Sequence, residues 1–530
     1  MVMLVHRMID EAALRHPDAC AVRCDGEALS YEQLARHSNG LAGVLLEAGL
    51  QRRNRVAVLL SKGLKVPVGF YGVLAAGGVL VPIDPRSPVE RVARILRATG
   101  AKYLVTEPGK QQLVVNVLER CPWVEHVVGL EAAETDRPRR CHPWSDVSEA
   151  ATDRPPGVEV IDMDPSYILH TSGTTGTPKL ILHTHRSAMS FVDWAVDEYS
   201  LNGDDRLSNH SSHHTCFATF DYYAAARAGA TTVILTPAML MMPGSLSAGL
   251  EKERVSVWYS VPTALVQLSV RGDLEARDLS CLRWVLFAGE TFPNKHLRRI
   301  KRQLPEARFS HVYGSTEVNV CTYYHLPEGE SFENPVPIGK ACWTSSIAVV
   351  DSELRSVPDG EVGELLVRGS TVMSGYWGEP QRSREVLIRR PVGGDLEEIY
   401  FRTGDRVRVR ADGNLTFVTR ADRQVKIRGH RVELEEIEMA LLTLDPVEEA
   451  AAFTVPDGEG SWALQSVVVV ADRGWPGRRD VLSRLKSVLP QHSLPEDITV
   501  VEAMPRTPTG KIDRNALRQQ LAQKEGQQDD

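Results

Sequence analysis

The sequence predicts an α/β protein with a large N-terminal domain of parallel-rich sheets and flanking helices, a small β subdomain, and a small α+β C-terminal domain. Buried-strand patterns alternate with amphipathic helical patterns over most of the first 314 residues. Repeated strand–helix units of this kind form parallel sheets whose faces are covered by helices. After about Ile338 the chain changes to short β segments with turns, and from Asp422 onward it becomes a compact mixture of helices and strands.

The first part of the chain shows the alternation clearly. Hydrophobic periodicity predicts a first helix within residues 1–17, further helices over residues 31–48, 66–76 and 89–98, and buried strands over residues 55–60 and 79–82. Residues 135–156 are rich in Pro, Arg and Asp and have no periodicity, so we expect a surface connection there.

The second part continues the pattern and then departs from it. Strand-like segments between helical stretches cover residues 231–235, 255–261, 284–288 and 309–313. The expected β subdomain contains strands over residues 346–351, 363–368, 406–410 and 414–418, with Asp-Gly hairpin signals at residues 359–360 and 412–413. Helices are predicted over residues 434–443 and 479–488.

Composition excludes several classes of function. The 530 residues are 42% hydrophobic and 25% charged, as in an ordinary globular protein, and the formal net charge of −8 argues against nucleic acid as a partner. There is no run of 18 apolar residues, so we expect no membrane span. The eight cysteines are scattered without a CxxC pair, which favours reduced thiols and a cytoplasmic protein.

The segment YILHTSGTTGTPKLILHTH, residues 167–185, contains the clearest chemical signal. A run of hydroxyl and glycine residues packs poorly in a core, but its backbone N–H groups and hydroxyls can converge on phosphate oxygens. It is not a Walker A motif, because no Gly-Lys-Ser/Thr follows the spacer. The alternative for such a stretch is a flexible surface turn.

Three later segments carry further candidate groups. In HVYGSTE, residues 311–317, a carboxylate could hold Mg²⁺ and a tyrosine ring could face a purine. In YFRTGD, residues 400–405, an acid follows a tight turn and could bind a ribose, although a turn aspartate is the simpler interpretation. Lys511 lies in a Pro/Gly loop, and an exposed lysine is usually only solvated.

Taken in order, these segments and AAGGVLVPIDPRSPVER, residues 75–91, resemble the motifs of the adenylate-forming superfamily, which includes acyl-CoA synthetases, the adenylation domains of nonribosomal peptide synthetases, and luciferases. The resemblance covers nearly the whole chain. It implies an N-terminal adenylation core over residues 1–421, a mobile C-terminal lid domain over residues 422–530, and the use of ATP and Mg²⁺.

The resemblance also implies roles for individual residues. The phosphate loop would consist of Thr171, Ser172, Gly173, Thr174, Thr175, Gly176 and Lys179. In the next motif Tyr313 would stack on adenine beside Gly314 and Ser315, Thr316 would contact the α-phosphate, and Glu317 would bind Mg²⁺. Asp405 would bind the ribose, Arg420 would reach the ribose or a phosphate, and Lys511 would clamp the carboxylate and the charge developing at phosphorus. Asp422 would be the hinge, and Lys426 and Gly429 would line the thiol-transfer site.

These parts suit a two-step reaction. Attack of a carboxylate on the α-phosphorus of ATP gives an acyl adenylate and pyrophosphate, and the step depends on positioning and charge stabilisation. A thiol then takes the place of pyrophosphate in the site, and a moving C-terminal domain is expected for this exchange.

The acid-binding segment departs from the family pattern. Amino-acid activators commonly show a motif like HFDxSxxD…AGA, in which the first Asp pairs with the substrate ammonium. If Phe220-Asp221 were that Phe-Asp pair, Ala228-Gly229-Ala230 would follow too soon. Anchored on Ala228-Gly229-Ala230, Asp221 matches the second acid and Thr215-Cys216 replaces the ammonium-binding pair. A buried ammonium without a carboxylate partner is costly.

We therefore expect an aryl or other acid without the usual amine as substrate, or an amine held by another group. By the motif alignment, the expected pocket residues, each of which could equally be ordinary core, are His214, Cys216, Phe217, Phe220, Tyr259, Leu286, Ala288, Gly289, Val312, Val320 and Cys321. A metal site formed by His210, His213, His214 and Cys216 is disfavoured by their crowded spacing.

The acceptor of the acyl group is the last expectation. Few residues follow Arg514, so we expect the acceptor to be a separate molecule. We expect it to be the phosphopantetheine thiol of a carrier protein, because the motif sequences look more like those of peptide synthetases than those of CoA ligases. CoA or an amine is the alternative acceptor. A rival of another class is a catalytically silent adenylate-binding protein, which intact Lys511, Glu317 and Asp405 argue against.

Overall fold

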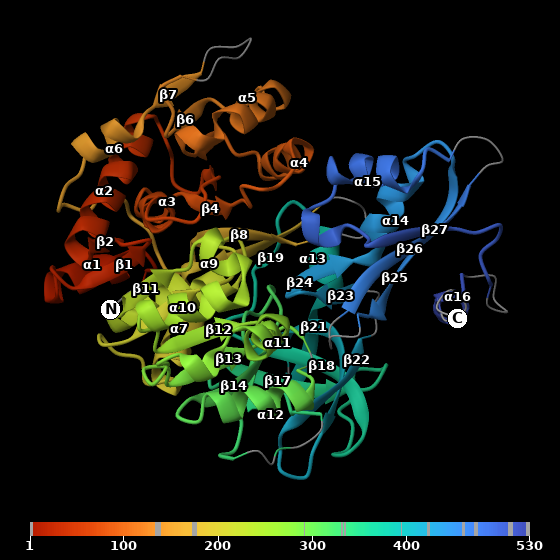
Figure 1. The fold of residues 1–530 in the computed structure, drawn as a ribbon. Helices are drawn as coiled ribbons and strands as arrows, with labels where there is room; N and C mark the ends of the chain where they lie inside the picture. Colours follow the sequence, from red (N-terminus) through yellow and green to blue (C-terminus); the bar gives the residue numbers. More distant parts are fainter. Residues whose placement is uncertain are drawn as a thin grey trace. The chain divides into compact units, whose positions relative to one another are not determined.

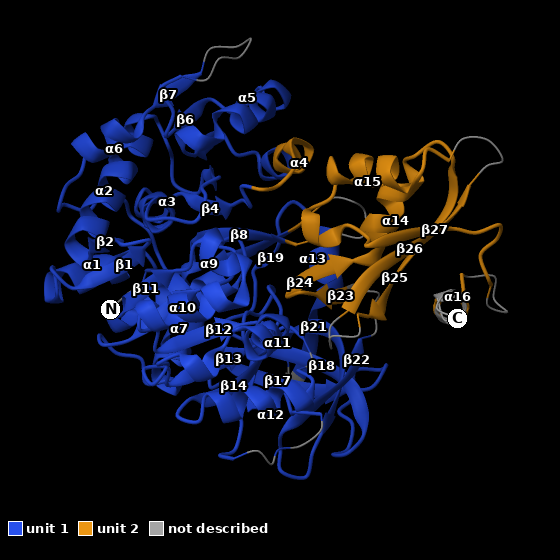
Figure 2. Cartoon of the chain, in the orientation of Figure 1, with its two compact units in different colours: residues 1–85, 95–170, 180–421 blue, residues 86–94, 171–179, 422–530 orange. Residues whose placement is uncertain are grey.

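A computed structural model gives the fold and describes residues 4–132, 139–171, 178–290, 292–329, 332, 335–393, 395–420, 424–457, 462–470, 475–506 and 512–525. The elements are numbered in chain order, and Figure 1 labels those for which there is room. The chain divides into two compact units, the first formed by residues 1–85, 95–170 and 180–421, and the second by residues 86–94, 171–179 and 422–530 (Figure 2). The α/β fold class expected from the sequence is confirmed.

An eight-stranded sheet lies in the first half of the chain, in the order β19-β9-β8-β4-β3-β5-β6-β7. Its strands are β3 (Arg55–Val58), β4 (Val79–Pro82), β5 (Tyr103–Val105), β6 (His126–Val128), β7 (Arg140–His142), β8 (Pro165–Thr171), β9 (Lys179–Thr184) and β19 (Gly375–Tyr376). The pairs from β8 through β4 and β3 to β7 are parallel, as the strand–helix alternation predicts.

The first three of the connecting helices follow the predicted ranges closely, and the last two were not predicted. The connecting helices are α2 (Tyr31–Glu47), α3 (Lys65–Ala75), α4 (Val89–Thr99), α5 (Gln111–Arg120) and α6 (Trp144–Glu149). Helix α2 begins at a capping box, in which the Gln33 amide donates to the Ser30 hydroxyl at 3.2 Å and the Ser30 amide donates to the Gln33 side chain at 2.9 Å. The surface connection expected over residues 135–156 is wrong in its described part, because β7 and α6 both lie there.

A nine-stranded sheet has the order β16-β15-β14-β13-β12-β10-β11-β1-β2. Its strands are β1 (Cys20–Cys24), β2 (Glu27–Ser30), β10 (Arg206–Asn209), β11 (Thr231–Ile234), β12 (Val257–Ser260), β13 (Trp284–Phe287), β14 (Arg308–Tyr313), β15 (Thr322–His325) and β16 (Lys340–Ala341). The helices between them include α1 (Arg7–Arg15), α7 (His185–Glu198), α8 (Ala225–Ala228), α9 (Pro237–Met241), α10 (Pro243–Lys252), α11 (Pro262–Arg271) and α12 (Asn294–Gln303). The run from β11 through β10, β12 and β13 to β14 is parallel, so these strands end at the same edge.

The β subdomain is a five-stranded antiparallel sheet in the order β17-β18-β21-β20, with β22 paired to β21. Its elements are β17 (Ser345–Val350), β18 (Val362–Gly369), β20 (Leu387–Gly393), β21 (Leu396–Val409), β22 (Leu415–Arg420) and the helix α13 (Pro380–Val386). Strand β21 has 14 residues, and only its last four, residues 406–409, lie in the strand expected over residues 406–410.

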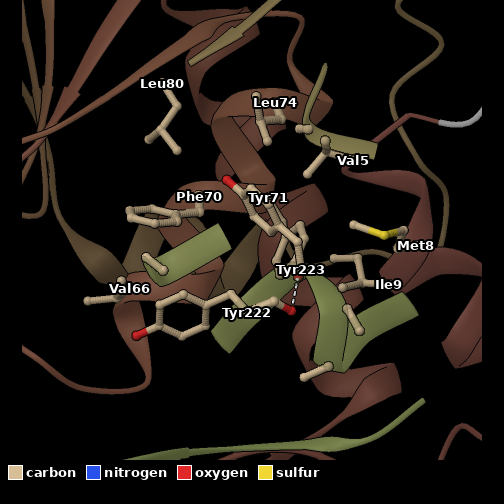
Figure 3. Close-up of a cluster of buried hydrophobic side chains, with 14 of the residues drawn as sticks. Val5, Met8, Ile9, Val66, Phe70, Tyr71, Leu74, Leu80, Tyr222 and Tyr223 are labelled. Atoms are coloured by element: carbon tan, nitrogen blue, oxygen red, sulfur yellow. Dashed lines mark hydrogen bonds between the residues drawn. The ribbon is translucent and has the colours of Figure 1, made fainter. Parts of the chain in front are cut away.

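The main core of the first unit joins the two large sheets through aromatic residues (Figure 3). Tyr71 of α3 is buried, and its hydroxyl donates to the carbonyl of Tyr222 at 3.0 Å. Tyr222 belongs to a π-helical turn, η2 (Thr219–Ala224), and Phe70 contacts its ring edge-on at 5.8 Å. Buried hydroxyls therefore satisfy backbone groups of a turn that departs from α-helical bonding.

The second unit contains a three-stranded sheet, a hairpin and helices. Its elements are β23 (Gln424–Ile427), β24 (His430–Glu433), α14 (Leu434–Leu442), β25 (Val447–Pro456), β26 (Trp462–Val470), α15 (Arg478–Lys486), β27 (Asp497–Val500) and α16 (Arg514–Glu525). None of the described helices in either unit has the length and apolar character needed to cross a membrane.

An ion pair inside the second unit joins residues far apart in sequence. Arg91 of α4 donates to Glu436 of α14 at 3.0 Å, and their side chains are 6% and 3% exposed. Burial raises the pKa of Glu436 even though the charge of Arg91 opposes that shift. The carboxylate therefore depends on its arginine to stay ionised.

We expect Arg91→Met to lower the free energy of urea unfolding of the second unit by about 3–5 kcal/mol, because it leaves a buried carboxylate without its cation. Arg36→Met is the matched control, since Arg36 pairs with Glu32 at 3.9 Å in an exposed position on α2. That variant should change stability by less than about 0.5 kcal/mol. Equal effects of the two substitutions would contradict the role of Arg91 as the cation that keeps Glu436 ionised.

Candidate active site

Strand β14 ends at Tyr313 and leads into a tight turn formed by residues 314–317. The amide of Cys321 donates to the Tyr313 carbonyl at 2.9 Å and closes the loop between β14 and the next strand, which contains this turn. A Cβ atom on Gly314 would lie 1.6 Å from the carbonyl oxygen of Asn319. Only glycine therefore fits at this position.

Tyr313, Asp405 and Arg420 form one hydrogen-bonded group. Asp405 and Arg420 lie opposite each other on β21 and β22, and Arg420 Nη1 donates to Asp405 Oδ1 at 2.5 Å. The Tyr313 hydroxyl donates to Asp405 Oδ2. Burial, followed by the charge of Asp405, raises the pKa of Tyr313 well above its usual value, so the hydroxyl keeps its proton. The structure thus brings together three residues that the sequence predicted for nucleotide binding.

Glu317 and Thr316 are fixed by different partners. Glu317 is fully buried, and the Tyr376 hydroxyl donates to its Oε1 at 2.9 Å. Burial lowers the pKa of His183 to about 4, so its ring is neutral at physiological pH. His183 Nε2 donates to the carbonyl of Thr316 at 2.8 Å. The turn that follows β14 is therefore held from both β9 and β19.

The expected walls of the acid pocket come mostly from the ends of β12, β13 and β14. One core cluster, with Cys216 and Phe217 packed against it, contains Phe220, Tyr259, Leu286, Ala288, Val312 and Val320. The ring centroids of Phe217 and Phe220 lie 4.5 Å and 5.3 Å from that of Tyr259. These three aromatic rings therefore pack against one another, and two of them follow Cys216 closely in sequence.

Two expected pocket residues behave differently. Cys321 is fully buried in a separate cluster with Val318 and Ile338, and its thiol donates to the Tyr313 carbonyl at 3.6 Å. The structure therefore places this side chain with the β subdomain rather than with the other walls. Gly289 follows β13 with φ of +98°, a conformation that favours glycine.

Sequence reasoning missed a polar cluster at the ends of β4 and β8. The register Leu80↔Tyr167 aligns these parallel strands, which brings Asp84 and His170 to the same edge. The rings of His170 and His214 are stacked with centroids 5.5 Å apart, and His214 Nε2 lies 4.0 Å from Asp84 Oδ2. The rule that ligands bind at the carboxyl ends of parallel strands could have pointed to Asp84 and His170.

A small cavity of about 10 Å³, room for roughly one water molecule, lies in the same part of the first unit. Its lining comes from β4, β8, α3 and the segment before and within η2, and consists of Phe70, Leu80, Pro82, Tyr167, Leu169, His213, Thr215, Ala218, Thr219 and Tyr223. Within the described ranges, no group of three or more His, Cys, Asp or Glu could hold a metal ion, and this includes the histidines before Cys216.

The remaining candidate residues belong to the second unit. Thr171 ends β8, and Lys179, the first residue of β9, is 3% exposed and forms an ion pair with Glu433 of β24. Lys426 lies in β23, and Gly429 forms the turn before β24 with φ of +79°. The candidates that lie outside the described residues are Ser172, Gly173, Thr174, Thr175, Gly176, Asp422 and Lys511.

Comparison with known proteins gives consistent matches. The family model described as "AMP-binding enzyme" matches residues 9–377, and the one described as "AMP-binding enzyme C-terminal domain" matches residues 436–511. An L-proline–[L-prolyl-carrier protein] ligase of Pseudomonas fluorescens is 32% identical over 98% of this chain and 99% of its own. A ligase of the same name from Streptomyces coelicolor is 33% identical over 93% of this chain and 92% of its own.

Solved structures agree in fold. The amide bond synthetase McbA of Marinactinospora thermotolerans superposes with a TM-score of 0.86 at 25% identity, covering 98% of this chain and 99% of the other. The adenylation domain AlmE of Vibrio cholerae, in complex with glycyl-adenosine-5'-phosphate, gives a TM-score of 0.83 at 23% identity over 98% of each chain.

We expect Gly314→Ala to disrupt the turn after β14, because the added Cβ would overlap the carbonyl oxygen of Asn319. Overpacking of this kind costs about 1–3 kcal/mol or more. In a thermal-unfolding comparison, Gly43→Ala on α2 is the matched control, since nothing lies within 4 Å of its added Cβ. That helical substitution should stabilise the protein by about 0.5–1 kcal/mol. A Gly314→Ala protein as stable as the unmodified chain would refute the close approach.

Proposed function

The chain belongs to the AMP-binding enzyme family, and we propose that it activates a small carboxylic acid with ATP and passes the acyl group to the phosphopantetheine thiol of a carrier protein. Membership confirms the resemblance to adenylate-forming enzymes, so the protein is an adenylate-forming ligase that uses ATP. In the first step a carboxylate oxygen forms a bond to the α-phosphorus and the bond to pyrophosphate breaks. In the second step a thiolate sulfur bonds to the acyl carbon and AMP leaves.

The group formed by Tyr313, Asp405 and Arg420 carries the proposal. A carboxylate held between an arginine and a phenol keeps its charge and its orientation, which suits it to accept hydrogen bonds from ribose hydroxyls. The Tyr313 ring supplies an apolar face for adenine beside it. On the pattern of the family, Thr171, Lys179 and Lys511 would then contact phosphate and carboxylate oxygens.

Mg²⁺ is part of the proposal, with Glu317 as its protein ligand. Mg²⁺ usually binds one or two carboxylates and completes its shell with waters and substrate phosphates. A single buried carboxylate, oriented by the Tyr376 hydroxyl, fits that requirement. When bound, the ion would neutralise charge on the phosphates, and the protein's part is to orient Glu317.

The substrate proposal changes from the one first expected. An acid without an amine was the leading expectation from Cys216, but two of the most similar relatives are named as L-proline–carrier protein ligases. They favour the alternative, amino-acid activation with the amine held by another group. We propose that the substrate is a small ring-bearing amino acid, because three aromatic rings form one wall of the expected acid pocket next to Cys216.

The proposed acceptor of the acyl group is supported by the same two relatives. Both ligases are named for a carrier protein, which supports a phosphopantetheine thiol as the nucleophile. The structural likeness to an amide bond synthetase keeps an amine as the second candidate acceptor. A parallel transfer assay with a carrier protein that bears a free phosphopantetheine thiol, with CoA and with a primary amine separates the three.

Whether the substrate carries an amine is tested by ATP–pyrophosphate exchange with acids that share a five-membered ring. We expect L-proline to support exchange at least about tenfold better than cyclopentanecarboxylic acid, since one paired charge contributes about 1.4 kcal/mol or more. Pyrrole-2-carboxylic acid keeps the ring nitrogen without its charge and completes the series. Preference for the unaminated ring would overturn the amino-acid proposal, and ATP binding without exchange for any acid would point to a silent adenylate binder.

Variants at Cys216 sharpen this test. Cys216→Asp restores the carboxylate of the family pattern and should raise the KM for unaminated acids by about tenfold, because it buries a charge without a partner. Cys216→Ser is the neutral control of similar size and should leave the order of substrates unchanged.

We expect Asp405→Asn to raise the KM for ATP by about 10- to 100-fold, because hydrogen bonds to a charged group contribute about 1.5–3 kcal/mol. Asp351→Asn in the same β subdomain is the control, since Asp351 pairs with exposed Arg355. Thermal unfolding of both variants shows whether the fold is intact. An unchanged KM in folded Asp405→Asn protein would remove Asp405 from the nucleotide site.

A further inference from the structure

Asp221 is a buried carboxyl group that the proposed reaction does not use. It lies in the π-helical turn η2 and is completely buried. Asn209 Nδ2 donates to its Oδ2 at 2.8 Å, and its Oδ1 has no hydrogen-bond partner among the described residues. Burial raises the pKa of Asp221 to about 8, although the Asn209 hydrogen bond and the charge of Lys62 oppose the shift. The carboxyl is therefore neutral near pH 7.

Asn209 connects this carboxyl to the acid pocket. It is the last residue of β10, and its Oδ1 accepts a hydrogen bond from the Tyr222 hydroxyl at 3.3 Å. The Lys62 ammonium donates to the backbone carbonyls of Asn209 at 2.7 Å and His210 at 2.8 Å. These bonds fix the direction in which the chain leaves β10.

The segment that leaves β10 carries the pocket. Residues 210–217 include His214, which stacks on His170, and Phe217, which faces Tyr259. Cys216 stands in the same segment at the position where the family pattern has an ammonium-binding acid. A small shift of the chain at Asn209 would therefore move several groups that face the substrate.

We propose that Asp221 is a positioning residue for the acid pocket, acting through its hydrogen bond with Asn209 on residues 210–217. The inference rests on the proposed function, since it assumes that this segment binds the acid. Loss of the proton would leave an anion in the core with only the Asn209 amide as hydrogen-bond donor and Lys62 as the cation. Lys62 would then be drawn from the carbonyls that it holds, and the segment would lose its position.

The imidazole and phenol groups around Asp221 do not change charge near pH 8. Burial lowers the pKa of His210 to about 3, so its ring is already neutral. Burial also raises the pKa of Tyr222 and Tyr259 well above the usual value, and the charge of Asp221 adds to both shifts. Among these groups, Asp221 is the one expected to titrate between about pH 7 and pH 9.

The direction of the pH effect follows from the raised pKa. Folding favours the protonated carboxyl, so the stability of the protein relative to an Asp221→Asn variant should fall as pH rises from about 4 to about 8. The KM for the acid should rise above about pH 8, by up to about tenfold per pH unit, because the competent form is depleted. The KM for ATP should not follow it.

Two substitutions test the proposal. Asp221→Asn keeps the shape and the acceptor of the neutral acid, so we expect the KM for the acid to stay within about twofold at pH 7 and to lose its rise above pH 8. Asp221→Leu removes the acceptor, so the KM for the acid should rise at every pH while the KM for ATP stays constant. A Leu variant with unchanged acid KM, or an Asn variant as impaired as the Leu variant, would overturn the inference.

Asp205→Asn is the matched control. Asp205 is buried in the same unit, but Arg283 donates to it at 2.6 Å and Ser256 at 2.7 Å. Burial opposes its ionisation, but these bonds hold the pKa of Asp205 below its usual range. Its replacement should lower stability at pH 7 and leave the pH dependence of the acid KM unchanged.

A readout without catalysis separates failure of this inference from failure of the proposed function. The alkylation rate of half-buried Cys216, followed by peptide mass spectrometry, reports the position of residues 210–217. At one fixed pH near 9 we expect faster alkylation in the unmodified protein and in Asp221→Leu than in Asp221→Asn. Equal rates in all three proteins would refute the positioning role, whether or not any acid supports exchange.

Discussion

Parallel pairing of strands is the constraint on which the first unit depends. Parallel strands begin at one edge of a sheet and end at the other, so residues that follow them are brought together whatever their separation in sequence. The walls of the expected acid pocket from Tyr259 onward come together at the ends of β12, β13 and β14. Asp84 and His170 come together at the ends of β4 and β8. The candidate chemistry is concentrated at these edges for that reason.

Three buried carboxyl groups in the first unit differ in their partners, and the partners decide their charge. Asp405 forms an ion pair with an arginine, which suits a group proposed to accept hydrogen bonds from a ribose. Glu317 accepts a hydrogen bond from a phenol hydroxyl and, in the proposed function, would gain its counter-charge from Mg²⁺. Asp221 has a neutral amide and keeps its proton. Burial raises the cost of ionisation in all three places, so the nearest donor determines the role.

Much of the fold could be predicted from the sequence, because periodicity reports local structure. Helix α2 and strand β4 follow the expected ranges closely, since α2 has an amphipathic pattern and β4 is a short, wholly apolar run. The short edge strand β7 was missed because three residues carry too little periodicity to be recognised. Most of β21 was missed because its charged residues belong to a partly exposed antiparallel strand.

The sequence by itself determined the order of the motifs, and with it the family, the nucleotide and the residue types that would bind ATP. Those properties depend on short stretches in which neighbours in sequence act together. Only the tertiary structure decided that Asp405 lies between Tyr313 and Arg420, that Cys321 faces the β subdomain, and that Asp221 supports Asn209. These relations join residues through strand register and burial, and neither quantity is encoded in the spacing of residues along the chain.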